Sequence, residues 1–161
     1  LGTQTPGNFA AMNAVIDYVC EIGKYFSDAT DRRELYIEGM NRIKLHERAL
    51  LYRLLQGSDK TPGLRHIEGV SVFADELDLT SRDLIVAMSI NGMDVCDAVL
   101  EYEKRGIIVC DRSNRSMYAK RIVESIGIEG AIRVSPLHCH SVEDIDRFLR
   151  ETISIVKDNI H

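Results

Sequence analysis

The chain has 161 residues and a net charge of −5, with 45% hydrophobic and 28% charged residues. This is the composition of one ordinary globular domain and not of a disordered segment. No apolar run approaches the ~20 residues that span a membrane, and no signal peptide is recognisable. Because the mild negative charge is spread along the chain, we expect a soluble cytoplasmic protein whose partners include neither nucleic acid nor a membrane.

Two helices are expected in the N-terminal third of the chain. Apolar residues at helical spacing predict the first helix over residues 8–26, after a Pro-Gly turn. Asp31 and Glu34 have the spacing of a capping box, and they predict a second helix that ends at Gly57.

Short strands and helices alternate in the remainder of the chain. Residues 84–90 are the strongest strand candidate, because they form an apolar, partly β-branched run between turn signals. Further strands are predicted at residues 64–68, 70–73, 107–110 and 131–135, and helices at residues 91–105 (capped by Asn91), 117–126 and from 142 onward (capped by Ser141). Few and short strands with helices between them predict an α/β fold of the α+β type, with a small sheet and helices packed on one face.

The four cysteines, Cys20, Cys96, Cys110 and Cys139, form no CxxC pair. We therefore expect no disulfide framework, which fits a reducing compartment. Each cysteine lies in an apolar or strand-like segment, so we interpret all four as buried free thiols that act as small hydrophobic residues.

Two basic features could bind an anion. Arg133 lies in a predicted strand, where a charged side chain has to reach solvent, an ion-pair partner or a ligand, and its planar fork suits a carboxylate. The loop at residues 111–115 carries Arg112 and Arg115 at the end of a strand and could hold an anion, or it could be an ordinary solvated loop.

Two further motifs are open to more than one interpretation. His138-Cys139-His140 would place both histidines on one face of an extended segment, but a third and fourth ligand are missing from the pattern, so we expect no metal site. Gly2-Thr3 precedes a predicted helix and could present a hydroxyl and backbone N–H groups to a phosphate, or could be a plain turn.

Several segments follow one another in an informative order. Gly2-Thr3 precedes the helix that Asn8 opens, residues 84–90 form a central strand, EKRGIIV at 103–109 joins a helix to a strand, and AIRVS at 131–135 is followed by SVEDID at 141–146. In this order and spacing, essentially the whole chain resembles the C-terminal part of the cysteine desulfurase and class V aminotransferase family. These are fold-type I enzymes that depend on pyridoxal phosphate (PLP).

The resemblance implies a mostly antiparallel sheet, as in the C-terminal domain of the PLP-transferase fold. Residues 1–30 would be an interdomain segment and linking helix, and residues 31–161 the small domain. The large PLP-binding domain would lie outside this chain, and the full protein would be a homodimer. By position, Thr3 and Gly2 would contact the cofactor phosphate, and Arg133 would hold the α-carboxylate of an amino-acid substrate.

The chain also departs from the family pattern. The place of the nucleophilic cysteine of the desulfurases is held by Arg115, and Cys110 lies earlier, within a strand, which argues against the usual persulfide route. His138-Cys139-His140 stands where the family often has a Tyr-Asn pair.

None of the six lysines follows a histidine, as the lysine that bonds PLP usually does in the family. The implied function is therefore that of a C-terminal domain of a desulfurase-like or aminotransferase-like enzyme, which is not competent alone. The start of the chain within a turn at Leu1 agrees with this interpretation. The alternative is a free-standing, non-catalytic α/β module that binds a ligand or regulates another protein.

Overall fold

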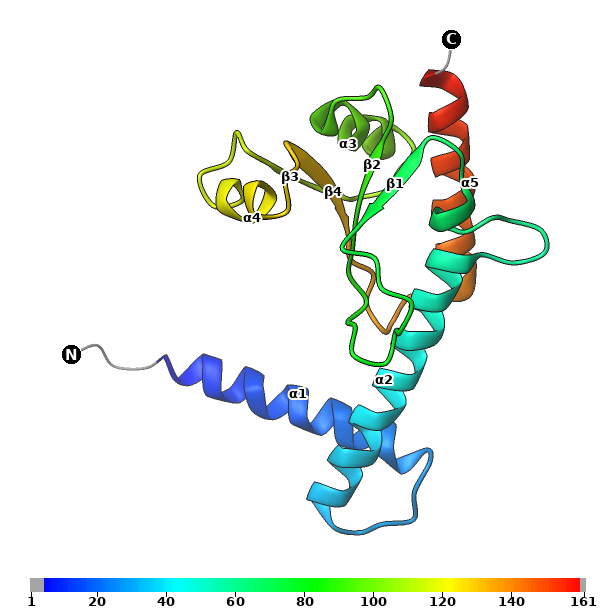
Figure 1. Cartoon of the computed structure of the whole chain (residues 1–161). Coiled ribbons are helices and arrows are strands. Elements are labelled where there is room, and N and C mark those ends of the chain that lie inside the picture. The colour runs from blue at the N-terminus through cyan, green and yellow to red at the C-terminus, as the bar shows by residue number, and fades with distance from the viewer. Residues whose placement is uncertain (1–4, 160–161) are drawn as a thin grey trace. The chain divides into compact units, whose positions relative to one another are not determined.

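The computed structural model describes residues 5–159 (Figure 1). The chain divides into two compact units at the boundary between His46 and Glu47, within the long helix α2 (Arg32–Gln56). The predicted division into residues 1–30 and 31–161 refers to a longer protein and stays a prediction. No helix in the described part of the chain is long and apolar enough to cross a membrane.

The first unit contains α1 (Pro6–Lys24) and the beginning of α2, so both predicted helices are confirmed. Pro6 occupies the first turn of α1, where its missing N–H costs no hydrogen bond. Asp31 caps α2, because its Oδ1 accepts hydrogen bonds from the backbone N–H groups of Arg33 at 2.9 Å and Glu34 at 3.0 Å.

Within this unit, α1 and α2 pack against each other at two glycines, Gly23 of α1 and Gly39 of α2. A Cβ atom added to Gly39 would lie 2.1 Å from the carbonyl oxygen of Val19, and one added to Gly23 would lie 2.1 Å from that of Leu35. The obstructing atoms belong to the backbone and cannot rotate away. The two helices therefore approach each other closely because neither glycine has a side chain.

We expect Gly39→Ala to destabilise the packing of α1 on α2 by about 1–3 kcal/mol, the usual cost of overpacking. Hydrogen exchange of the α1 amides should accelerate, and chemical denaturation should report the loss. Gly7→Ala is the matched control, since a Cβ there meets only a methyl group at 4.0 Å and alanine favours the helix. Unchanged protection of α1 in Gly39→Ala would contradict the expectation.

The second unit contains a four-stranded antiparallel sheet in the order β1-β2-β4-β3. The strands are β1 (Val70–Phe73), β2 (Val86–Ile90), β3 (Cys110–Ser113) and β4 (Gly130–Val134). The predicted α+β fold class is confirmed, and every pairing in the sheet is antiparallel.

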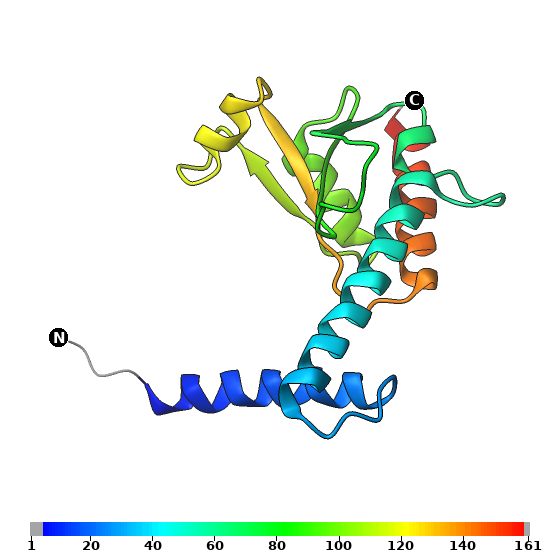
Figure 2. The ribbon, with the colours of Figure 1, turned by 60° about the horizontal axis from the view of Figure 1, so that its bottom comes forward.

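One face of the sheet and three helices enclose the core. Figures 1 and 2 show α5 (Val142–Asn159) beside the second half of α2, and α3 (Val95–Lys104) contacts β2, β4 and α5. Apolar side chains from these elements form one cluster, which includes Leu50, Leu54, Val86, Met88, Tyr102, Ile132, Val134, Leu149 and Ile155. The short helix α4 (Lys120–Ser125) contacts β3 and contributes nothing to this cluster.

Three predicted elements are wrong in type or position. Residues 64–66 form a 3-10 helix, η1 (Leu64–His66), in place of a strand, because Leu64 and Ile67 are both buried and a spacing of three suits a helical turn. Strand β3 begins at Cys110 and not at Ile107, whose N–H instead bonds the carbonyl of Tyr102 at the end of α3. Helix α4 is shorter than the predicted range 117–126.

The caps of α3 and α5 differ in how well the sequence predicted them. Helix α3 begins after Asp94, whose Oδ1 accepts a hydrogen bond from the Cys96 N–H at 2.9 Å, so Asn91 is not its cap. Ser141 is the predicted cap of α5, and it forms a capping box with Asp144: the Ser141 N–H donates to Asp144 Oδ2 at 2.8 Å, and the Asp144 N–H donates to Ser141 Oγ at 3.2 Å.

A hydrogen-bonded pair of hydroxyls lies inside the core. The Thr152 hydroxyl donates to the Phe148 carbonyl at 2.8 Å, so the Tyr102 hydroxyl donates to Thr152 Oγ1 at 2.7 Å. The Tyr102 ring also stacks on Phe148, with centroids 5.3 Å apart. Burial raises the pKa of Tyr102 well above its ordinary value.

We expect Thr152→Val to cost about 1–3 kcal/mol of unfolding free energy, because it leaves the buried Tyr102 hydroxyl without an acceptor. Tyr102→Phe is the control: it keeps the ring stack and leaves Thr152 bonded to Phe148, so it should cost less. A raised pKa in the folded state means that this contribution is complete below the unfolded-state value of ~10 and falls as the pH rises above it. Urea unfolding measured against pH should show a smaller alkaline loss in Tyr102→Phe, and equal losses would contradict this.

Candidate functional site

Arg133 lies on the face of the sheet that points away from the core. Its neighbours in β4, Ile132 and Val134, are both buried in the core, and successive side chains of a strand point to opposite faces. Arg133 pairs with Ala87 of β2 on one side and with Cys110 of β3 on the other. These residues therefore form a row across the face of the sheet that is turned away from the core.

The guanidinium of Arg133 is incompletely bonded. Its Nη2 lies 3.6 Å from Cys110 Sγ, while its Nε is buried and has no hydrogen-bond partner. Among residues 5–159, no carboxylate lies within ion-pair distance of it. A charged strand residue is expected to reach solvent, an ion-pair partner or a ligand. For Arg133, the structure shows no ion pair within this part of the chain.

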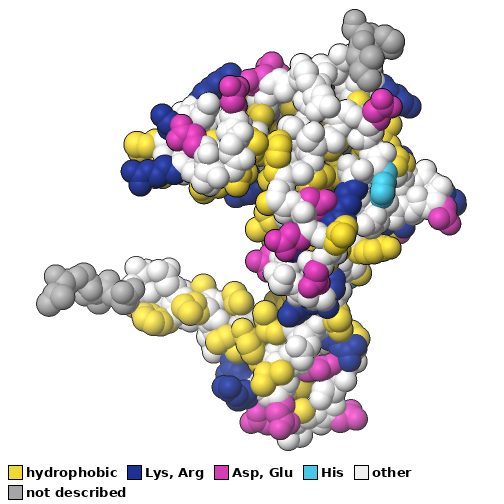
Figure 3. Space-filling model, in the orientation of Figure 1, with side chains coloured by type: hydrophobic (Ala, Val, Ile, Leu, Met, Phe, Trp, Pro, Cys, Tyr) yellow, Lys and Arg dark blue, Asp and Glu magenta, His cyan; other side chains and the backbone are white. Residues whose placement is uncertain are grey.

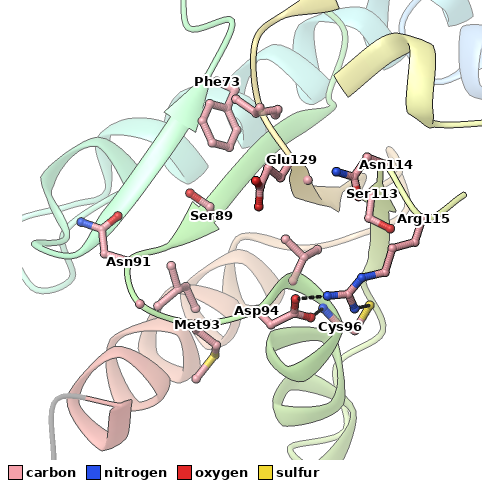
Figure 4. A pocket seen from close by; sticks show the side chains of 15 residues that line it. Phe73, Ser89, Asn91, Met93, Asp94, Cys96, Ser113, Asn114, Arg115 and Glu129 are labelled. Carbon is pink, nitrogen blue, oxygen red and sulfur yellow. Dashed lines mark hydrogen bonds and ion pairs between the residues drawn. The ribbon is translucent and has the colours of Figure 1, made fainter. Parts of the chain in front are cut away.

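A second polar site is a cavity of ≈ 360 Å³ at one end of the sheet (Figure 4). Asp94 and Cys96 reach it from the beginning of α3, Arg115 from the loop after β3, and Glu129 from the segment before β4. Figure 4 shows the side chains of Asp94, Cys96 and Arg115 turned toward one another on one wall of this cavity.

The positive charge in this cavity is already paired. Arg115 Nη2 lies 2.8 Å from Asp94 Oδ2, and Arg115 Nη1 lies 3.8 Å from Cys96 Sγ. The other arginine of the predicted loop, Arg112, lies within β3 instead, and it donates to the carbonyl of Asp111 at 2.8 Å. Arg115 lines this cavity and Arg112 does not, so the structure gives no support to an anion site formed by both arginines.

The four thiols have different environments, and the prediction that all are buried is wrong. Cys20 is buried, Cys96 and Cys110 are half-buried, and Cys139 is exposed. The prediction failed because it assumed that residues in apolar segments point inward, whereas β3 begins at Cys110 and places it on the face away from the core. All four cysteines are free.

His138 and His140 occupy different environments. His138 Nδ1 lies 3.9 Å from Glu47 Oε1, whereas His140 Nδ1 lies 3.0 Å from the Leu137 backbone nitrogen. Within residues 5–159, no three potential metal ligands lie close enough to hold an ion.

Two groups of residues bear on the binding of PLP: Gly2 and Thr3, which the resemblance places at its phosphate, and the lysines, because a lysine bonds PLP in the family. Gly2 and Thr3 lie outside the described residues. All six lysines are exposed, and Lys24, Lys104 and Lys120 pair with glutamates. The hydrogen bond from Lys24 to Glu21 raises the pKa of Lys24, whereas a lysine that attacks an aldehyde has to lose its proton. The contact with Glu21 therefore favours the protonated form of Lys24, which is the form that cannot attack.

The structure brings residues next to Arg133 and Arg115 that the sequence had not connected with these arginines. Ala87 and Cys110 flank Arg133, and Asp94 pairs with Arg115 across 21 positions of the chain. The capping role of Asp94 could have been suspected from its place before a helix. Its pairing with Arg115 has no local signal.

The fold is similar to that of several solved structures. One is a cysteine desulfurase from Thermococcus onnurineus NA1, with a TM-score of 0.64 and 23% identity over 79% of this chain and 29% of that one. The cysteine desulfurase CsdA from Escherichia coli has a TM-score of 0.58 and 14% identity over 81% of this chain and 32% of its own. A NifS-like protein from Rickettsia africae ESF-5 has a TM-score of 0.58 and 16% identity over 78% and 33%.

This chain therefore spans about a third of the length of each of these proteins. The likeness at these identities shows the fold alone. No protein-family profile matches the sequence, and the search of curated proteins found no match.

We expect Asp94→Asn to lower stability at neutral pH and to have little effect in acid. The hydrogen bond from the Cys96 N–H, and then Arg115, lower the pKa of Asp94. Because the pKa is lowered in the folded state, the contribution is present above the ordinary value of ~3.9 and is lost as the pH falls through the folded-state value. Urea midpoints of the two proteins should converge in acid.

Arg115→Gln is the control, because it removes the ion pair and keeps the cap of α3. Its effect at neutral pH should be smaller than that of Asp94→Asn. Midpoints that stay apart by the same amount at all pH values would show that the charge of Asp94 does not matter.

Proposed function

We propose that this chain is the C-terminal small domain of a PLP-dependent enzyme of the cysteine desulfurase type, and that Arg133 binds the α-carboxylate of its amino-acid substrate. The observation that carries this proposal is the unpaired guanidinium of Arg133, with its buried Nε, on the face of the sheet away from the core. The likeness in fold to cysteine desulfurases supports the class of enzyme.

A carboxylate matches the geometry of the Arg133 guanidinium. The guanidinium presents N–H groups in a planar fork that two carboxylate oxygens match with two parallel hydrogen bonds. Nε belongs to one edge of this fork, and it is buried and lacks a partner in the described part of the chain. Because Arg133 is half-buried, a bound carboxylate would be less screened by water than at an exposed site.

The chain would supply binding and orientation to the reaction. PLP, when bound, withdraws electrons from the amino acid, and the protein orients the substrate against it. Since none of the six lysines follows a histidine, as the lysine that bonds PLP usually does, the cofactor would be held by residues of a longer protein, with Gly2 and Thr3 near its phosphate. Arg115 stands where a desulfurase has its nucleophile, so we assign the reaction only to the lyases and transferases that act on amino acids.

The surface of α1 supports the two proposed protein partners, a large domain and a second subunit. Hydrophobic side chains lie along this helix in the space-filling view (Figure 3), and Phe9, Met12 and Val15 are 60%, 65% and 61% exposed. An apolar stripe of this kind typically marks a protein interface. We place the full protein in the cytoplasm, in agreement with its free cysteines.

The carboxylate clamp can be tested on the 161-residue protein by NMR. The Nε–Hε signal of Arg133 should shift when L-alanine is added and should remain in place with L-alaninamide, in which the carboxylate is blocked. Arg133→Lys keeps the charge but loses the fork, so binding should weaken several-fold.

Arg115→Lys is the matched control, because Asp94 already occupies that arginine, and it should leave the response of Arg133 unchanged. Equal shifts with L-alanine and L-alaninamide, or full binding by Arg133→Lys, would exclude Arg133 as the carboxylate clamp.

A further inference from the structure

The thiol of Cys110 lies against the guanidinium of Arg133. The two residues are paired in the sheet, and Cys110 Sγ is 3.6 Å from Arg133 Nη2. Both side chains are half-buried on the face of the sheet away from the core. Any oxygen atom added to this sulfur would therefore be held beside the guanidinium.

The other three thiols lack this arrangement. Cys20 is buried and its Sγ lies 3.4 Å from the carbonyl oxygen of Arg32, while Cys139 is exposed. Cys96 is 3.8 Å from Arg115, but Arg115 already forms an ion pair with Asp94. Among the described residues, Cys110 is thus the one thiol in contact with an arginine that has no carboxylate partner.

We propose that Cys110 is an oxidation site whose oxidised forms occupy the guanidinium of Arg133. In the first step, the Cys110 thiolate attacks one oxygen of hydrogen peroxide. An S–O bond forms and the O–O bond breaks, and the released hydroxide takes the proton of the new sulfenic acid to become water. Sulfur loses two electrons to the peroxide and becomes a sulfenate, and a second peroxide converts it in the same way to a sulfinate.

The oxidised sulfur resembles the end of a carboxylate. A sulfinate carries two oxygen atoms that share one negative charge, and a guanidinium binds such a group through charge-assisted hydrogen bonds of ~2.8 Å. The added oxygen atoms extend from sulfur into the space next to Nη2. The oxidised side chain of Cys110 would then be the anion bound by Arg133, in place of the carboxylate of a substrate.

This inference rests on the proposed function for its consequence, which is that oxidation blocks binding of the substrate carboxylate. The sulfenate would be reversible, because a small thiol displaces its oxygen to form a mixed disulfide, and a second thiol then restores Cys110. The sulfinate would not be restored by thiols.

The experiment measures Cys110 and Arg133 separately in the 161-residue protein. Peroxide-treated and untreated samples are labelled with phenylglyoxal, which reacts with free guanidinium groups, and peptides are analysed by mass spectrometry. We expect one or two oxygen atoms on Cys110 and a several-fold drop in labelling of Arg133. The drop should be absent in Cys110→Ser treated in the same way, and a thiol should restore labelling in the sulfenate sample.

Arg115 and Cys96 provide the matched control pair, because Arg115 already forms an ion pair with the carboxylate of Asp94. Labelling of Arg115 should not depend on oxidation of Cys96. Three results would overturn the proposal: Cys110 remains unmodified while Cys139 is oxidised, labelling of Arg133 is unchanged after oxidation of Cys110, or Arg133 is unreactive in the untreated protein.

The outcome is distinguishable from that of the carboxylate test. If reduced protein binds neither L-alanine nor L-alaninamide but oxidation still protects Arg133, the proposed function fails and the oxidation site stands. If reduced protein binds L-alanine and oxidised protein binds it equally well, the clamp stands and the oxidation site has no effect on it.

Discussion

The alternation of side chains along β4 is the constraint on which the candidate site depends. Ile132 and Val134 are needed in the core, so the residue between them has to point to the opposite face of the sheet. A charged arginine on the core side would lose its hydration without a partner, at a prohibitive cost in free energy. The same packing that stabilises the sheet therefore presents Arg133 on the other face, where a ligand or another domain can reach it.

The register of β3 against β4 then decides what Arg133 touches. Cys110 lies opposite Arg133 because β3 pairs from Cys110 to Ser113, and a shift by one residue would place the thiol on the core face. The sequence alone predicted that Arg133 lies in a strand, and it also predicted the helices that have clear caps. The position of Cys110 beside Arg133 could not be predicted, because Ile107 and Ile108 have the apolar pattern of a strand and suggest that β3 begins at Ile107. In the structure, Ile107 packs against the core after α3, and Ile108 is 92% exposed.

Ion pairing separates the two arginines that the sequence singled out. Arg115 and Arg133 each lie close to a thiol, but Arg115 is 68% exposed and is bound to Asp94. An exposed pair of this kind contributes little to stability, yet it occupies the donors that an external anion would need. Sequence patterns could identify both side chains as possible anion ligands. Only the position of Asp94, which comes from the folding of α3 onto the sheet, distinguishes the one that is available.

The lysines complete the argument about what this chain can do by itself. A lysine that bonds PLP has to be deprotonated at neutral pH, and burial or neighbouring cations achieve this by lowering its pKa. Here every lysine is exposed, and the carboxylate of Glu21 acts in the opposite direction by raising the pKa of Lys24. Among the described residues, the buried side-chain nitrogen that lacks a hydrogen-bond partner is Nε of Arg133, and an arginine cannot give up its proton at physiological pH. Under the proposed function, Arg133 would therefore bind and orient an anion, and the groups that break bonds would be supplied by other parts of a longer protein.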